Sequence, residues 1–366
     1  MSEAAIRPVL PPGVPAPWFT APALSGSANY VFSSAAGRPI LMLFFGAAGQ
    51  EHAAAALSVV AANRDLFDDT NACFFGITCD PADAAQGRIT QAIPGIRFFL
   101  DYDRSVSTLY GADFADGSGR YRPHWLLLDR SQRVVAPFAI DQGEAAVAAL
   151  RTLVAESDSL SDHAPVLVVP RVIEPALCRR LIDLYEAHGG EESGFMRQID
   201  GKTVRVTDPE HKRRRDVTIE DATLQRHLMV RVHDRLAPMI ARAFQFQATR
   251  MERYIVGCYS AGAGHFRPHR DNTTSGTAHR RFAVTINLNT GDYEGGDLRF
   301  PEFGQRTYRA PTGGAVVFSC SLLHEATPVT RGTRYAFLPF LYDDAAAKVR
   351  EENNRFLAED VPAYRG

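Results

Sequence analysis

Short apolar runs, separated by segments that favour helix, restrict the possible folds of the first 155 residues more than any other feature. Two of these runs, at 40–45 and 72–77, contain no charged or hydroxyl-bearing side chain. A strand of this composition is buried on both faces of its sheet. The alternation therefore predicts an α/β sheet with helices on both faces. The predicted strands are 40–45, 72–77, 97–101 and 125–128, and the predicted helices are 54–67 and 144–155.

The length of the chain indicates more than one domain. Its 366 residues are too many for one ordinary domain and suffice for two, each with its own core. A polar stretch at 156–163 marks the predicted boundary. We predict a first domain over 1–155, a linker over 156–164 and a second domain over 165–366.

Composition and charge narrow the class of protein. With 45% apolar residues, 22% charged residues and a formal net charge of -2, the chain is typical of a soluble globular protein. This balance predicts no general attraction to nucleic acid or to a membrane. Residues 1–17 lack the apolar core of a signal peptide, and no run is long enough to span a bilayer. Five cysteines without a Cys-x-x-Cys pair predict reduced thiols and a cytoplasmic protein.

Three residues in the second half have the chemistry of metal ligands. His269 and Asp271 are two positions apart, so in an extended segment both side chains point to the same face. His324 follows the apolar run 315–318, which reads as a buried strand. Two histidines and one carboxylate are typical of non-haem Fe(II) oxygenases. A zinc hydrolase is the alternative, since three protein ligands and a water also suit zinc.

Arg334 favours the oxygenase. It lies ten residues after His324 at the start of a predicted strand, and its planar guanidinium can hold a carboxylate with two hydrogen bonds. An oxygenase that takes electrons from a keto acid needs such a fixed cation, whereas a zinc hydrolase has no general need for one.

Several short motifs surround these residues in a fixed order. They are Tyr259 ten residues before His269, LN at 288–289, YEGGDL at 293–298, Pro311 with GG at 313–314, HEATPV at 324–329 and GTRYA at 332–336. Over about residues 165–345 the chain therefore resembles the 2-oxoglutarate- and Fe(II)-dependent dioxygenases, in their prolyl-4-hydroxylase-like branch.

This resemblance implies a double-stranded β-helix, or jelly roll, with flanking helices. It implies that 2-oxoglutarate binds the iron and Arg334, that Tyr259 donates a hydrogen bond to this cosubstrate, and that Asn287 occupies a second contact position. It also implies hydroxylation of a peptidyl or free amino acid or of a small metabolite, with ascorbate as the candidate reductant; a homodimer is a further hypothesis. The implied Fe(II) ligands are His269, Asp271 and His324.

The first domain resembles the thioredoxin fold in its peroxiredoxin form. The resemblance rests on LDYD at 100–103, LYG at 109–111, and RP at 122–123 ahead of LD at 128–129. Peroxiredoxins follow the first core strand with a proline, a threonine and the reactive cysteine, but here those positions hold Gly46, Gln50 and Ala53. Cys79 is the alternative candidate for a reactive thiol, but its neighbouring aspartate is expected to disfavour the thiolate. We therefore predict a domain without catalytic activity.

The segment 193–218 is rich in charge and lacks apolar periodicity. We predict a solvated loop, with a mobile lid over the iron as the functional alternative. Apolar residues at helical spacing on either side of it predict two helices that pack against the outside of the barrel, the second interrupted at Pro238. A binding protein in which both folds have lost their chemistry is the non-enzymatic alternative.

Overall fold

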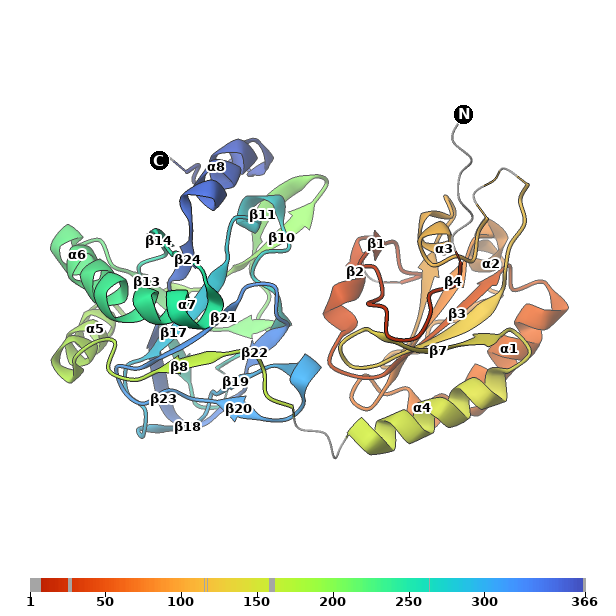
Figure 1. The fold of residues 1–366 in the computed structure, drawn as a ribbon, viewed down its shortest axis with the longest axis horizontal. Helices are drawn as coiled ribbons and strands as arrows, with labels where there is room; N and C mark the ends of the chain where they lie inside the picture. The colour runs from red at the N-terminus through yellow and green to blue at the C-terminus, as the bar shows by residue number, and fades with distance from the viewer. Residues whose placement is uncertain are drawn as a thin grey trace. The chain divides into compact units, whose positions relative to one another are not determined.

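The computed structural model describes residues 8–25, 28–114, 116, 118–157, 162–262 and 264–364. The chain divides into two units, residues 1–162 with 301–304, and residues 163–300 with 305–366. Figure 1 draws the first unit mainly in red to yellow and the second mainly in green to blue. Part of the predicted linker, residues 158–161, lies outside the described residues.

The first unit contains a five-stranded sheet in the order β5-β4-β3-β6-β7. Strands β3, β4 and β5 are parallel, and β6 and β7 form an antiparallel hairpin beside β3. This topology confirms the predicted thioredoxin-like fold. The strands are β3 (Ile40–Gly46), β4 (Cys73–Thr78), β5 (Ile96–Leu100), β6 (His124–Leu128) and β7 (Val134–Ala139), with the short pair β1 (Thr20–Ala21) and β2 (Tyr30–Val31). The helices are α1 (Glu51–Ala62), α2 (Pro81–Ala85), α3 (Ser105–Leu109) and α4 (Gly143–Ser157).

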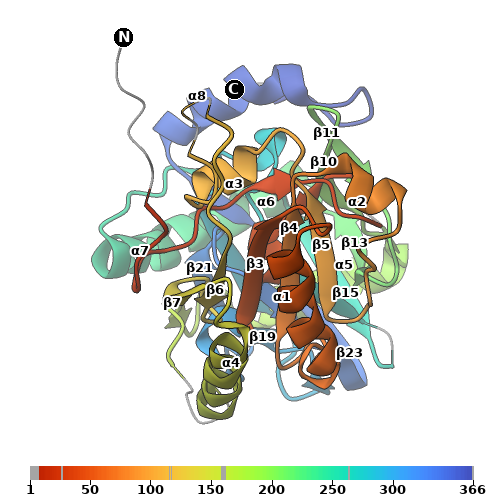
Figure 2. The ribbon, with the colours of Figure 1, turned by 90° about the vertical axis from the view of Figure 1, so that its right-hand side faces the viewer.

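Strand β3 is buried on both faces, which explains its uninterrupted apolar sequence. Leu41, Leu43 and Phe45 pack in a core cluster with residues of α1 and α4, and Figure 2 shows α1 and α4 beside this sheet. The alternate side chains, such as Met42 and Phe44, belong to a second cluster that includes residues of α3. Because successive side chains of a strand point to opposite faces, an apolar residue is required at every position.

The second unit contains the predicted double-stranded β-helix. Its larger sheet has ten strands along the path β14-β24-β17-β23-β15-β13-β9, with β8, β18 and β21 attached at the sides, and its smaller sheet has the order β12-β16-β22-β19-β20. The strands of the larger sheet are β8 (Leu167–Val169), β9 (Glu191–Glu192), β13 (Arg215–Thr218), β14 (Arg250–Glu252), β15 (Ile255–Ser260), β17 (Phe282–Asn287), β18 (Tyr293–Gly295), β21 (Ala315–Ser319), β23 (Val329–Phe337) and β24 (Phe340–Tyr342). Those of the smaller sheet are β12 (Lys212–Arg213), β16 (His265–His269), β19 (Leu298–Arg299), β20 (Thr307–Tyr308) and β22 (His324–Ala326).

Flanking helices cover the larger sheet, as predicted. Apolar side chains of α5 (Pro175–His188), α6 (Ala222–Arg231) and α7 (Ala237–Phe244) share one core cluster with residues of β15, β17, β21 and β23. The predicted interruption near Pro238 takes the form of a π-helical turn, Val232–Leu236, between α6 and α7. This turn accommodates the missing amide hydrogen of the proline without ending the helical path. A last helix, α8 (Asp344–Glu352), follows β24.

The prediction of a solvated loop at 193–218 is wrong. Strands β10 (Phe195–Ile199) and β11 (Lys202–Val206) form a hairpin. Strand β12 pairs with β16 in the smaller sheet, and β13 pairs with β15 in the larger sheet. Lys212 and Arg214 are only 3% and 7% exposed. Both side chains have internal partners, because Nζ of Lys212 donates to Ser193 and to the Gly194 carbonyl and the Arg214 guanidinium pairs with Asp216.

The described helices include none that combines the length and the apolar character needed to cross a bilayer.

Candidate metal centre

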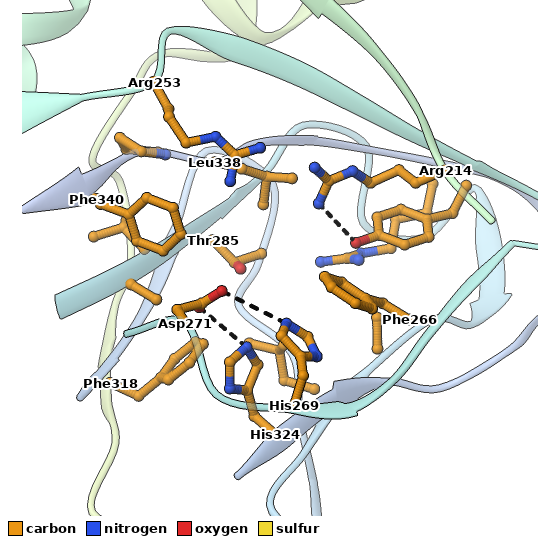
Figure 3. Close-up of a pocket in the computed structure, with 17 residues that line it drawn as sticks. Arg214, Arg253, Phe266, His269, Asp271, Thr285, Phe318, His324, Leu338 and Phe340 are labelled. Atoms are coloured by element: carbon orange, nitrogen blue, oxygen red, sulfur yellow. Dashed lines mark hydrogen bonds and ion pairs between the residues drawn. The ribbon is translucent and has the colours of Figure 1, made fainter. Parts of the chain in front are cut away.

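Two adjacent strands of the smaller sheet bring the three predicted ligands together. Strand β16 ends at His269, strand β22 begins at His324, and these residues are directly paired across the antiparallel ladder. Asp271 lies two residues beyond β16, where its backbone N–H donates to the Cys320 carbonyl at 3.0 Å. The Asp271 carboxylate oxygens are 3.3 Å from Nε2 of His324 and 3.6 Å from Nε2 of His269. The three side chains offer ligand atoms within 4.8 Å of one another and converge on one cavity (Figure 3).

Backbone carbonyls fix the orientation of both imidazoles. Nδ1 of His269 lies 2.8 Å from the Arg267 carbonyl, and Nδ1 of His324 lies 3.0 Å from the Leu322 carbonyl. Because a carbonyl only accepts, each Nδ1 carries a hydrogen, and in a neutral ring the lone pair that can bind a metal ion is then on Nε2. The ring of Phe266 stacks on His269 with the ring centroids 3.4 Å apart and restrains its rotation. Nε2 of both rings is therefore the nitrogen that can coordinate a metal ion.

The protonation states also suit a metal ion. Burial and the adjacent His324 lower the pKa of His269 to about 4, so this imidazole is neutral at neutral pH. Burial acts to raise the pKa of Asp271, but His324 and His269 outweigh it and hold that pKa well below its usual range. Metal binding requires a neutral imidazole and an ionised carboxylate. Two histidines and one carboxylate fit a divalent ion that keeps further coordination positions open.

Arg334 lies on β23 and is only 2% exposed. Its Nε is buried without a hydrogen-bond acceptor among the described residues, and one terminal nitrogen reaches Oδ1 of Asn287 at 3.5 Å. A buried cation with one long hydrogen bond and an unpaired Nε is costly. The backbone makes room for it at Gly296, where a Cβ atom would lie 2.9 Å from Cδ of Arg334 and φ is +65°. A carboxylate ligand would supply the missing acceptors.

The two other predicted cosubstrate contacts lie on either side of Arg334. Tyr259 on β15 lines the cavity, its ring centroid lies 4.9 Å from the Arg334 guanidinium carbon, and its hydroxyl accepts from Arg214 at 3.3 Å. Asn287 on β17 donates to the Ala310 carbonyl at 2.9 Å, which turns its Oδ1 toward Arg334. Asn287 does not itself line the cavity. Its contact to the cosubstrate stays a prediction, whereas its contact to Arg334 is present.

The cavity has a volume of about 480 Å³ including its open mouth. Both sheets contribute to its walls, and three arginines face it, although the sequence predicted only Arg334. The lining residues are Arg214, Arg253, Tyr259, Phe266, His269, Asp271, Ala283, Val284, Thr285, Leu298, Phe318, His324, Ala326, Arg334, Leu338, Pro339 and Phe340.

The sequence contained a signal for one of the two missed arginines. Lys212, Arg214 and Asp216 alternate with the exposed Arg213 and Arg215, which is the period of a strand with one buried face. The signal was hidden because the buried face carries charge in place of apolar side chains. Arg253 belongs to no motif, and no local pattern indicates its position.

Two histidines and a carboxylate inside a double-stranded β-helix are the arrangement of a non-haem iron oxygenase. The family model of the 2OG-Fe(II) oxygenase superfamily matches residues 254–342. The second unit therefore contains a 2OG-Fe(II) oxygenase domain.

Curated relatives match stretches of 111 to 117 residues of this chain. A PKHD-type hydroxylase of Pseudomonas fluorescens is 34% identical over 111 residues, which cover 28% of this chain and 47% of that protein. A PKHD-type hydroxylase of Synechococcus sp. is 27% identical over 117 residues, covering 30% and 50%. PiuC, a PKHD-type hydroxylase of Pseudomonas aeruginosa, is 32% identical over 111 residues, covering 28% and 47%. The chain thus spans about half the length of the curated relatives it matches.

Solved structures resemble each unit separately. A prolyl-4-hydroxylase of Pseudomonas putida has 19% identity and a TM-score of 0.37, and the match covers 49% of this chain and 93% of that one. A prolyl hydroxylase of Trichoplax adhaerens, in complex with a peptide fragment of hypoxia inducible factor, has 17% identity and a TM-score of 0.37, covering 51% and 86%. Peroxidoxin BcpB of Mycobacterium tuberculosis has 21% identity and a TM-score of 0.32, covering 39% and 98%.

Proposed function

We propose that the protein is an Fe(II)- and 2-oxoglutarate-dependent dioxygenase that hydroxylates its substrate. The observation that carries this proposal is the presence, in one cavity, of the three convergent ligand groups and of Arg334, whose buried Nε has no acceptor among the described residues. The ligand set alone would also suit zinc. The buried arginine distinguishes the two proposals, because a keto acid has a second carboxylate for it to bind.

Different residues of the cavity would bind the metal ion, orient the cosubstrate and limit the access of water. His269, Asp271 and His324 would hold the ion from one side and leave the side that faces the cavity open. Arg334 would orient the cosubstrate through its distal carboxylate, with Tyr259 beside it. Apolar walls such as Phe318 and Leu298 limit the access of water. When bound, iron and 2-oxoglutarate supply the oxidising chemistry that places one oxygen atom of O₂ on a C–H bond of the substrate.

The substrate, the reductant and the compartment are also matters of proposal. The curated relatives are named PKHD-type hydroxylases, which supports hydroxylation as the reaction. As its substrate we propose an amino acid, free or within a peptide, or a small metabolite. Ascorbate is the proposed reductant. The five cysteines are free, which supports a reducing compartment such as the cytoplasm.

The test is succinate formation by the full chain with Fe(II), 2-oxoglutarate and O₂. In the variant His324→Ala the ion loses one of three protein ligands, and we expect succinate formation to fall by about 100-fold or more, since loss of outer partners alone costs about 10- to 100-fold. His265→Ala is the matched control, because His265 lies on β16 but does not line the cavity. Equal turnover in the His324 variant and the control would refute the proposed ligand set.

A further inference from the structure

Arg253 is a cation of the cavity that the proposed function does not use. It follows β14 (Arg250–Glu252) and has φ of +66°, a conformation that is strained for a residue with a side chain. From this position its guanidinium is directed toward the cavity that contains Asp271, as Figure 3 shows. The rest of the fold therefore maintains a strained residue at the wall of the site.

The only ion pair of Arg253 among the described residues is a weak one. Its terminal nitrogen lies 3.7 Å from Oδ2 of Asp216. The Asp216 carboxylate is already occupied, because Arg214 donates to both of its oxygens at 2.6 and 2.7 Å and Ser193 donates to Oδ2 at 2.5 Å. Asp216 thus neutralises Arg214 and leaves the charge of Arg253 largely uncompensated.

The neighbouring Arg280 has the close carboxylate partner that Arg253 lacks. Both Arg253 and Arg280 lie over the ring of Phe340, with their guanidinium carbons 5.2 and 4.1 Å from its centroid. Arg280 has a full partner, because its Nε donates to Glu252 at 2.7 Å. Burial, together with the positive charges of Arg214 and Arg280, lowers the pKa of Arg253 to about 10, so it remains a cation at neutral pH.

Of the three arginines that line the cavity, only Arg253 would lack a close carboxylate partner in a loaded site. The two carboxylates of 2-oxoglutarate would neutralise Arg334 and, together with Asp271, a divalent ion, while Asp216 neutralises Arg214. Arg253, whose side chain is 30% exposed, would keep one unmatched positive charge beside the space left for substrate. A partly buried guanidinium whose one ion pair among the described residues is 3.7 Å long, to a carboxylate shared with Arg214, favours an anionic ligand.

We propose that Arg253 binds a carboxylate of the substrate, and that the substrate is an acid whose reacting carbon lies between Arg253 and the metal ligands. This inference rests on the proposed function and names its substrate class. A free amino or organic acid and an acidic peptide side chain share the same recognised group, and the probes below distinguish them.

The experiment measures binding by saturation-transfer NMR to the full chain with Zn(II) as an inert ion and saturating 2-oxoglutarate. The free-acid probes are N-acetyl-L-alanine and N-acetyl-L-proline, each compared with its carboxamide. The peptide probe is acetyl-Ala-Asp-Ala-amide, compared with the asparagine peptide. We expect at least one acid to bind about tenfold more tightly than its neutral partner, since a charge-assisted pair is lost with the amide.

Variants assign the preference to Arg253. The acid-to-amide ratio should fall to about one in Arg253→Gln and be partly restored in Arg253→Lys, which keeps the charge but not the planar fork. Arg331→Gln is the matched control, because Arg331 is 71% exposed and does not line the cavity. The melting temperature of each variant verifies that it is folded.

The outcomes separate this inference from the function on which it rests. Equal binding of acids and amides by the unmodified protein, or an acid preference that persists in Arg253→Gln, overturns the role of Arg253. Failure of the unmodified protein to bind 2-oxoglutarate with either Zn(II) or Fe(II) overturns the proposed function instead. A preference shown only by the peptide supports the inference and assigns the carboxylate to an acidic side chain.

Discussion

The Nε atom of Arg334 is buried and has no hydrogen-bond acceptor among the described residues. If a keto-acid carboxylate is its partner, Arg334→Ala should raise the Michaelis constant for 2-oxoglutarate by about 10- to 100-fold, because a charge-assisted bidentate contact is lost. Arg334→Lys should raise this Michaelis constant by less than Arg334→Ala does, since lysine keeps the charge but not the planar guanidinium. Arg331→Ala on the same strand is the control, as Arg331 is exposed and pairs with Glu294. An unchanged Michaelis constant in Arg334→Ala would contradict this role.

For single residues, the sequence predicts site residues that lie in a local pattern, such as the metal ligands. It does not predict residues that reach the site only through the tertiary fold, such as Arg253. His269 and Asp271 are two positions apart, and His324 follows a recognisable buried strand, so their convergence could be predicted. Arg253 reaches the cavity through a left-handed backbone conformation that no pattern encodes. Its ion-pair partner Asp216 lies on β13, whereas Arg253 follows β14.

At the scale of elements, β6 carries a histidine that makes the first unit sensitive to acid. His124 stacks on Phe44, and its Nε2 is buried without an acceptor among the described residues. Burial lowers the pKa of His124 to about 4, whereas the unfolded chain binds the proton near 6.5. The folded-state pKa is the lower one, so the contribution of neutral His124 to the stability of this unit is present above pH 6.5 and is lost as the pH falls toward 4.

The variant His124→Phe should remove this loss. Between pH 7 and pH 5 the unmodified protein should lose about 2 kcal/mol more unfolding free energy than the variant. Urea unfolding followed by tryptophan fluorescence measures it, because both tryptophans, Trp18 and Trp125, lie in the first unit. Equal losses in the two proteins would show that His124 is not the titrating group.

Strands could be predicted from the sequence where their buried side chains are apolar, but not where the buried side chains are charged or basic. The run at 40–45 corresponds to β3 because both faces of that strand pack in apolar clusters. Strand β12 and Arg214, the residue between β12 and β13, were predicted as loop because the buried side chains there, Lys212 and Arg214, are basic and have internal partners. Hydrophobic periodicity cannot detect a strand whose buried face is polar.

At the scale of the whole molecule, the first unit retains a thioredoxin-like fold without the residues of peroxide chemistry. Ala53, buried on α1, occupies the position that corresponds to the reactive cysteine of peroxiredoxins. The Sγ of Cys79 lies 3.4 Å from the Ser107 hydroxyl, and burial together with Asp101 raises the pKa of this thiol. The carboxylate responsible is thus Asp101, whereas the adjacent Asp80 caps α2. A thiol with a raised pKa forms little thiolate.

We therefore expect equal rates of peroxide consumption, with a thiol reductant, for the full chain and for Cys79→Ser. Cys73→Ser is a useful comparison, because Cys73 is fully buried and burial raises its pKa to about 12. Rapid peroxide turnover that disappears only in Cys79→Ser would make the first unit a peroxidase and the protein bifunctional.

The central claim is that one cavity binds Fe(II) and 2-oxoglutarate together. The most direct measurement is anaerobic titration of the iron-loaded full chain with 2-oxoglutarate, combined with metal analysis of the protein as purified. We predict one iron per chain and a visible absorption band that grows with 2-oxoglutarate, is absent in His324→Ala and requires a higher 2-oxoglutarate concentration in Arg334→Ala. Tightly bound zinc together with no 2-oxoglutarate binding would contradict the account and favour a zinc hydrolase.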